Sequence, residues 1–81
     1  MRTIKEYQDL DIALEAIVWK LLNEIELLIS ISGSEEALRD VMNVYVKHHP
    51  QFKEHLSYGF GRTHMWVSLQ GTGERMLFVE F

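Results

Sequence analysis

The chain has 81 residues, no cysteine and a formal net charge of −4, and 47% of its residues are hydrophobic. This length predicts a single domain, residues 1–81, that buries only about 60% of the surface exposed by the unfolded chain. The absence of cysteine excludes disulfides and thiolate metal sites, and the hydrophobic content is that of a globular chain. The acidic balance disfavours a duplex-DNA binder, which normally carries a basic excess.

No secretory signal and no membrane span is expected in this chain. Acidic residues interrupt the N-terminal segment 1–9 before the apolar region of a secretory signal can form. The most apolar window, 12–31, contains four charged residues, which is too many for a comfortable membrane span. Since the lack of cysteine also fits a reducing compartment, we expect a cytoplasmic protein with no membrane partner.

A long amphipathic pattern predicts a first helix from Ile4 to Leu28. Its apolar residues recur at the i, i+3, i+4, i+7 spacing of one helix face: Leu10, Leu14, Ile17, Val18, Leu21, Leu22, Ile25, Leu28 and Ile29. A helix of this length would extend about 35 Å, which is more than the rest of a small domain easily covers. The end of this helix stays open, because residues 27–31 also alternate like a short strand.

Local signals define a second helix. Ser34 is a good N-cap, and Glu35 and Glu36 follow it in the first turn, where the helix dipole favours acids. Pro50 ends the helix, because the residue before a proline avoids the α conformation. A proline also suits the first position of a helix, so we expect one further short turn from Pro50 to Leu56.

The C-terminal part reads as a β-hairpin. Residues 64–70 and 74–81 alternate like strands, and the loop 71–73 contains two glycines. Both strands are apolar on both faces, whereas a hairpin with one buried face alternates apolar and polar residues. The predicted fold class is therefore α+β: two N-terminal helices, the first one long, then a C-terminal antiparallel β-hairpin, with 27–31 as a possible third strand. Either this strand or a second chain would cover the hairpin, so we also expect a homodimer.

One partner-binding patch is predicted on the first helix. Ile12, Ala16 and Trp19 fall together on the helical wheel, away from the main apolar face. Polar residues surround them, as in a protein interface with a polar rim. The full patch is Ile12, Glu15, Ala16, Trp19, Asn23 and Glu26. The alternative is that the hairpin or the N-terminus covers Trp19 within the same chain.

A second set alternates aromatic and basic residues, namely Tyr58, Phe60, Arg62, His64 and Trp66. In one extended strand these side chains would share a face, and such a stripe can stack the bases of single-stranded nucleic acid. The glycines at 59 and 61 favour the alternative, in which the strand is broken and the aromatic residues pack in the core or in a loop.

The four histidines, His48, His49, His55 and His64, raise the possibility of a metal site or small-ligand site. Their spacing is not the i, i+4 pattern of a helical metal pair, so we favour surface and helix-end roles. No nucleophile–base set is recognisable. We therefore expect no enzymatic activity, no catalytic residues and no cofactor.

The charge is distributed unevenly along the chain. Residues 1–46 carry four basic and nine acidic side chains, and residues 47–81 carry four basic and three acidic ones. An acidic helical half can occupy a basic groove on a partner. The preferred hypothesis is a small acidic interaction module, an inhibitor, adaptor or regulator that docks on a larger macromolecule, as viral or plasmid-type antagonists of nucleic-acid-handling machines do. The alternatives are single-stranded nucleic-acid binding by the aromatic stripe, and metal or small-ligand binding by the histidines.

Overall fold

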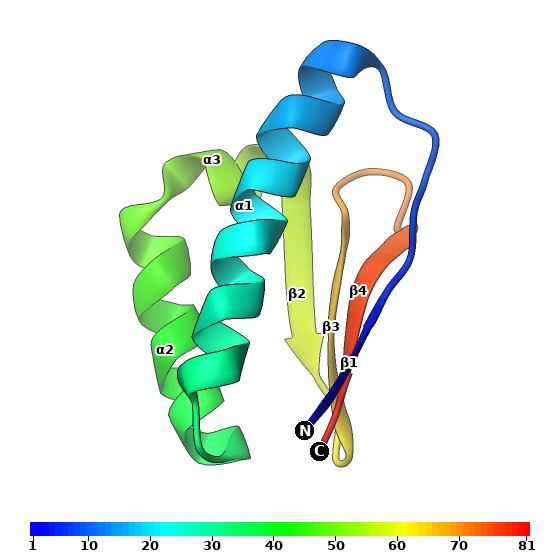
Figure 1. The fold of residues 1–81 in the computed structure, drawn as a ribbon. Helices are drawn as coiled ribbons and strands as arrows, with labels where there is room; N and C mark the ends of the chain where they lie inside the picture. The colour runs from blue at the N-terminus through cyan, green and yellow to red at the C-terminus, as the bar shows by residue number, and fades with distance from the viewer.

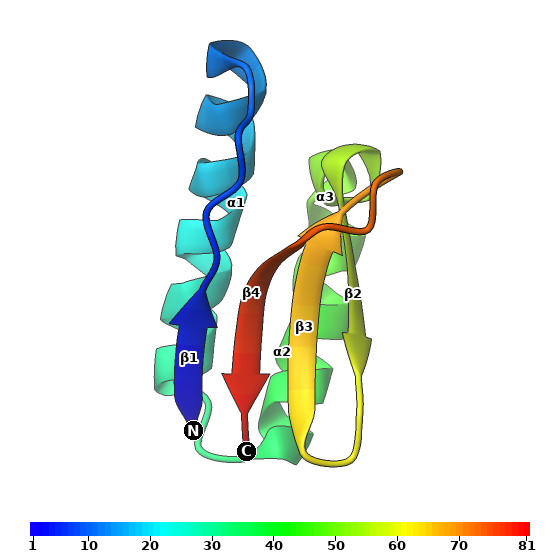
Figure 2. The same ribbon diagram turned by 90° about the vertical axis from the view of Figure 1, so that its right-hand side faces the viewer.

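The computed structural model describes all 81 residues and shows an α+β fold with two layers (Figure 1). The elements in chain order are β1 (Arg2–Lys5), α1 (Ile12–Ile31), α2 (Glu35–His48), α3 (Pro50–His55), β2 (Leu56–Phe60), β3 (His64–Leu69) and β4 (Arg75–Glu80). The four strands form one antiparallel sheet in the order β1-β4-β3-β2. The helices all cover the same face of this sheet, and its other face carries no element (Figure 2). We call these the inner and the outer face.

Helix α1 begins eight residues later than the predicted start at Ile4. The Asp11 side chain accepts a hydrogen bond from the Leu14 amide at 2.9 Å and so caps the first turn at this point. Residues 2–5 form the edge strand β1 instead, paired with β4. The third strand therefore comes from the N-terminus, and the prediction that the helix includes this segment is wrong.

Residues 27–31, the alternative third strand, belong to α1, so that alternative is also wrong. Ile29 continues the buried stripe of the helix, which fixes this segment in the helical period. The helix ends where the Ser32 hydroxyl donates to the Leu28 carbonyl at 2.7 Å, just before Gly33. None of the helices combines the length and the apolar character that a membrane crossing requires.

Helices α2 and α3 agree with the prediction. The Ser34 hydroxyl accepts from the Ala37 amide at 3.2 Å, and Glu35 and Glu36 occupy the first turn of α2. Pro50 stands at the start of α3, which ends at His55. Phe52 on this short helix is 1% exposed, so α3 closes one end of the core.

Strands β3 and β4 confirm the predicted hairpin, but β2 was not expected. The segment taken as broken by its glycines pairs along its whole length with β3, with Gly59 opposite Trp66. A Cβ atom at Gly59 would clash with the Trp66 ring, so the ring lies directly over the glycine. The glycine thus makes room for the tryptophan and does not end the strand.

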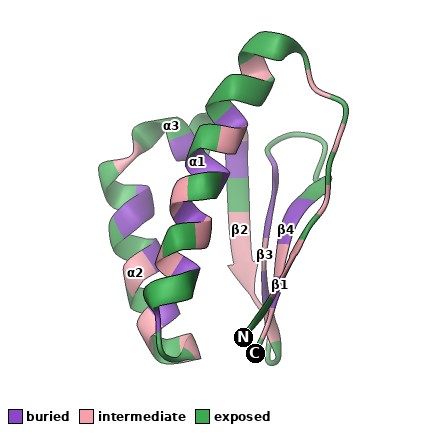
Figure 3. Cartoon of the chain, viewed as in Figure 1, coloured by how far each residue is buried: buried purple, intermediate pink, exposed green.

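The core fills the space between the helices and the inner face of the sheet (Figure 3). A register shift between β3 and β4 leaves Met76 between the pairs Ser68–Arg75 and Val67–Leu77. Because of this bulge, Met76 and Leu77 are both fully buried although they are consecutive. One cluster contains all the buried apolar residues: Val18, Leu21, Leu22, Ile25, Ile29, Leu38, Met42, Tyr45, Val46, Phe52, Leu56, Met65, Val67, Leu69, Met76, Leu77 and Val79.

The close approach of Trp66 to Gly59 predicts a specific sensitivity. Gly59→Ala displaces the Trp66 ring and should cost about 1–3 kcal/mol of stability, as overpacking does. Gly33→Ala is the matched control, because a Cβ atom there meets nothing within 4 Å. Urea unfolding of both variants checks this. In a Trp66→Ala background the Gly59→Ala cost should vanish, and an undiminished cost there would show that the ring is not its cause.

Candidate functional site

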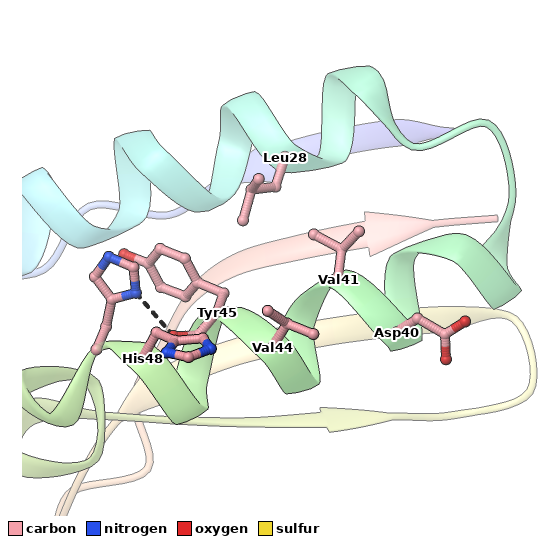
Figure 4. A pocket seen from close by; sticks show the side chains of 7 residues that line it. Leu28, Asp40, Val41, Val44, Tyr45 and His48 are labelled. Atoms are coloured by element: carbon pink, nitrogen blue, oxygen red, sulfur yellow. Dashed lines mark hydrogen bonds between the residues drawn. The ribbon is translucent and has the colours of Figure 1, made fainter.

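An apolar groove of about 410 Å³ runs between α1 and α2 on the side of the helices that faces away from the sheet (Figure 4). We call it the helix groove. Its lining residues come from both helices and from the turn that follows α2: Leu28, Asp40, Val41, Val44, Tyr45, His48 and His49. Leu28 points from α1 toward α2, where Val41 and Val44 point back (Figure 4). The wall of the groove is therefore apolar on both sides.

Exposed aliphatic side chains accompany the helix groove. Val44 in its wall is 58% exposed, and Leu27 and Ile31 on α1, beside Leu28, are 65% and 71% exposed. Single exposed apolar residues are normal, but an apolar groove with exposed aliphatic side chains on both of its helices favours an interaction site. The sequence carried a signal for the α2 wall that we did not use: Val41, Val44 and His48 follow each other at helical spacing, next to the buried stripe.

A polar cluster closes one end of the helix groove. The His49 ring stacks on the Tyr45 ring with centroids 4.0 Å apart. Its Nδ1 lies 2.8 Å from the Tyr45 carbonyl oxygen, which can only accept, so Nδ1 carries the proton. The Tyr45 hydroxyl donates to Glu24 at 3.4 Å, and His49 Nε2 lies 3.9 Å from the same carboxylate. Glu24 thereby links α1 to the end of α2.

This environment changes the acidity of the phenol. Burial of the side chain, and then the neighbouring Glu24 carboxylate, raise the pKa of Tyr45 to about 12. Tyr45 therefore stays neutral, and its hydroxyl stays a donor, at every physiological pH. Its role here is structural, because a phenol held in its neutral form is a poor general base.

Some carboxylates of the helical layer form ion pairs with basic side chains, and others do not. Two acids of the helical layer form ion pairs, Glu35 with Arg39 at 3.0 Å and Glu26 with Lys5 at 2.9 Å. The second pair joins α1 to β1, and its hydrogen bond raises the pKa of Lys5. Asp40, which lines the groove, has no basic group within 4.0 Å. An uncompensated negative charge therefore lies at the groove.

The predicted patch on α1 lies on another side of that helix. Ile12 is 87% exposed, but Trp19 is only partly exposed and packs against the core. Tyr7, from the segment before α1, lies on the Trp19 ring with centroids 5.0 Å apart. Glu15, Ala16 and Asn23 are exposed, and Glu26 is the partner of Lys5. The N-terminal segment thus covers part of Trp19 and adds Tyr7, which is 75% exposed, to the patch.

The assumption that Tyr58, Phe60, Arg62, His64 and Trp66 share one face is wrong. The turn after β2 places Phe60 opposite Met65 and Tyr58 opposite Val67, which inverts the alternation between the two strands. Tyr58 and Phe60 therefore lie on the inner face, where the Tyr58 hydroxyl donates to Asn43 of α2 at 2.9 Å. His64 and Trp66 lie on the outer face, and Arg62 is exposed in the turn.

The histidines do not converge. His48 and His49 lie at the end of α2, His55 ends α3 and His64 begins β3. No group of three or more histidine or acidic side chains is close enough to hold a metal ion. The geometry thus provides no ready metal centre, and the metal and small-ligand reading gains no support from the fold.

Comparison with known sequences places the chain in a family. Residues 2–79 match the family described as "Domain of unknown function (DUF8466)", and the chain belongs to this family. No curated protein and no solved structure matches the chain. The match spans β1 to β4, so the strands and helices described above belong to the family domain.

The contact between Tyr7 and Trp19 predicts how the α1 patch responds to mutation. Trp19→Ala should preserve the fold and cost less than the roughly 3–5 kcal/mol typical of a fully buried tryptophan. In a Trp66→Phe background, Tyr7→Ala should shift the Trp19 emission to longer wavelength, because water then reaches the ring. Urea unfolding and fluorescence spectra measure the two effects. An unfolded Trp19→Ala chain would show that the residue is a core residue and not an interface residue.

The raised pKa of Tyr45 predicts a loss of stability in alkali. The pKa in the folded chain, about 12, exceeds the ordinary value of 10.0, so the unfolded state loses this proton first. The contribution of Tyr45 to stability is therefore complete below pH 10 and is lost as the pH rises toward 12. Tyr45→Phe should flatten the fall in unfolding free energy over this range. Lys5 titrates in the same direction and is unchanged in the variant, so an identical slope would contradict the assignment.

Proposed function

We propose that this protein is a small acidic interaction module that binds a partner protein in the helix groove. The observation that carries the proposal is the groove itself, a concave apolar surface between two helices, beside exposed Leu27 and Ile31. Burying these side chains on a partner would contribute roughly 1.5–3 kcal/mol for each one that becomes fully buried. That gain is available only on binding, because nothing in the chain covers them.

The shape of the groove favours a helical segment as the occupant. Leu28 of α1 faces Val41 and Val44 of α2 across the groove, and an apolar groove between two helices can accept the apolar stripe of a third helix. Such a segment would present apolar residues at i, i+3, i+4 and i+7. The polar end formed by Tyr45, His49 and Glu24 would set its orientation, because an apolar residue placed there would leave polar groups without partners.

The charges select a segment with basic flanks. Asp40 at the groove and Glu36 one turn before it face solvent without a basic partner within 4.0 Å. Lysine or arginine beside the apolar stripe of the partner would pair with them and raise the association rate. The same acidity supports an inhibitory or regulatory mode of action in a cytoplasmic setting, in which the module binds and blocks a basic segment of a nucleic-acid-handling machine. The proposal involves no catalysis, no cofactor and no metal.

The helix groove is a better docking site than the α1 patch. Trp19, the largest apolar side chain of that patch, already packs on the core and on Tyr7. The gain from covering it further is correspondingly smaller. Binding by the patch of Ile12, Ala16 and Trp19 stays a prediction that the same experiment tests.

Affinity capture from lysate of the native host, followed by a binding titration with the captured protein, tests the proposal. Val44→Arg places a cation in the apolar wall and should weaken binding by at least about 30-fold, the loss expected for a 2 kcal/mol hot spot. Gln51→Arg adds the same charge at an exposed position of α3 outside the groove, and its affinity should equal that of the wild type.

Three other outcomes are informative. Equal affinities of Val44→Arg and the wild type would exclude the helix groove as the docking site. If Trp19→Ala alone weakened binding, the docking site would be the α1 patch. If added salt did not weaken binding, the acidic rim would have no role in selecting the partner.

A further inference from the structure

The outer face of the sheet is a second surface whose chemistry the proposed docking function does not use. Figure 2 looks onto this face and shows all three helices behind the strands. The register assigns its side chains, which alternate with the inner ones along each strand. They are Arg2 and Ile4 of β1, Ser57 and Gly59 of β2, His64, Trp66 and Ser68 of β3, and Arg75, Phe78 and Glu80 of β4.

The centre of the outer face is an aromatic cluster. The His64 ring lies 4.9 Å from the Phe78 ring and 5.5 Å from the Trp66 ring, measured between centroids. All three are only partly buried, although each is surrounded by strands on both sides. A sheet with one solvated face normally carries polar residues there. The Arg75 guanidinium lies over the Phe78 ring, 4.4 Å from its centroid, and shields part of this cluster. The aromatic surface that stays accessible indicates a face that is covered in the working state of the protein.

The shape of the outer face suits packing against a second sheet, face to face. Trp66 lies down over Gly59 instead of standing away from the sheet. The neighbouring Ser57 and Ser68 are small, so bulky rings lie beside shallow positions. A second surface with the same arrangement can place its rings over these positions, and two sheets packed in this way interdigitate at a separation of about 10 Å.

The charges on the outer face decide which partner fits. The strand pair β1–β4 carries one positive and one negative charge at each of its two ends. At one end Arg2 lies opposite Glu80, and at the other Arg75 forms an ion pair with Glu6. Histidine aside, Arg2 and Arg75 are balanced by Glu80 and by Glu6, which directly follows β1, so these charges sum to zero. A single-stranded nucleic acid would place its phosphates beside Glu6 and Glu80, which repel them. A second copy related by a two-fold axis carries the same balanced set of charges, so the two faces do not repel each other at long range.

We infer that the outer face of the sheet is the contact through which two copies of this chain form a symmetric dimer. The dimer buries Trp66 and Phe78 against the same residues of the other copy and has its helices on the outside. Given the proposed docking function, the two helix grooves then face away from each other. One dimer therefore presents two docking sites and gains avidity for partners that carry repeated segments.

Sedimentation velocity from low to high micromolar concentration tests the dimer. Ser57→Arg introduces a long charged side chain at an exposed position of the outer face, and it should raise the dimer dissociation constant at least about tenfold. Phe78→Ser should have a larger effect, and the melting temperature of each variant confirms that the monomer remains folded. Gln51→Arg, which adds the same charge on α3, should dimerise like the wild type.

Further variants and one binding measurement test this inference separately from the docking proposal. Val44→Arg should leave the dimer intact, since it changes only the helix groove. A wild-type chain that stays monomeric throughout the concentration series overturns the inference. Dissociation by Val44→Arg instead of Ser57→Arg also overturns it and moves the contact to the helices. Binding of a mixed-sequence single-stranded oligonucleotide, with quenching of Trp66 fluorescence, would assign the outer face to nucleic acid.

Discussion

The packing of α1 and α2 against the inner face of the sheet is the interaction on which the rest of the structure depends. Every fully buried side chain belongs to this one apolar layer. The layer also joins the two ends of the chain, because β1 and β4 lie side by side beneath α1 and are tied to it by the Lys5–Glu26 pair. A domain of this size has no second core that could compensate for a loss here.

The same layer determines which surfaces are left for other molecules. Two helices cover one face of a four-stranded sheet, so the chain has two broad free surfaces: the outer side of the helix pair and the outer face of the sheet. Both keep apolar groups at their centres, Val44 beside Leu28 on one and Trp66 beside Phe78 on the other. These side chains are only partly buried or exposed within the monomer, and the apolar area that they still expose stabilises the protein only when another surface covers it.

Local signals in the sequence were sufficient for the helices. Ser34 and Pro50 fixed α2 within a residue, because capping and proline geometry act over one helical turn. The start of α1 was missed although Asp11 is an equally good N-cap, because Leu10 extends the apolar period before it. The strand β1 has only four residues, two of them basic, and nothing marks it except its pairing with β4.

Non-local geometry limited what could be predicted about the sites. The faces of Tyr58 and Trp66 depend on how many residues the turn between β2 and β3 contains, because one residue more or less inverts the alternation. Gly59 was taken as a break in the strand, since the ring that covers it comes from the neighbouring strand. The helix groove requires the relative placement of α1 and α2, which no pattern within either helix contains. For the α1 patch, the periodicity of one helix indicated exposed residues such as Ile12, but it could not show that Tyr7 and the core cover part of Trp19.

The two free surfaces differ in charge, and this difference is why we propose a different kind of partner for each of them. Asp40 at the helix groove and Glu36 one turn away have no basic partner, so a second copy of the chain would meet its own negative charge there, whereas a basic foreign segment would be attracted. The outer face balances Arg2 and Arg75 against Glu80 and Glu6, so it neither attracts nor repels a copy of itself at long range. Contact there depends on the fit of Trp66, Phe78 and the small residues around them. The charge distribution along the sequence, acidic in the helical half and nearly neutral in the hairpin, is thus consistent with the two proposals, which assign partner binding to the helices and self-association to the sheet.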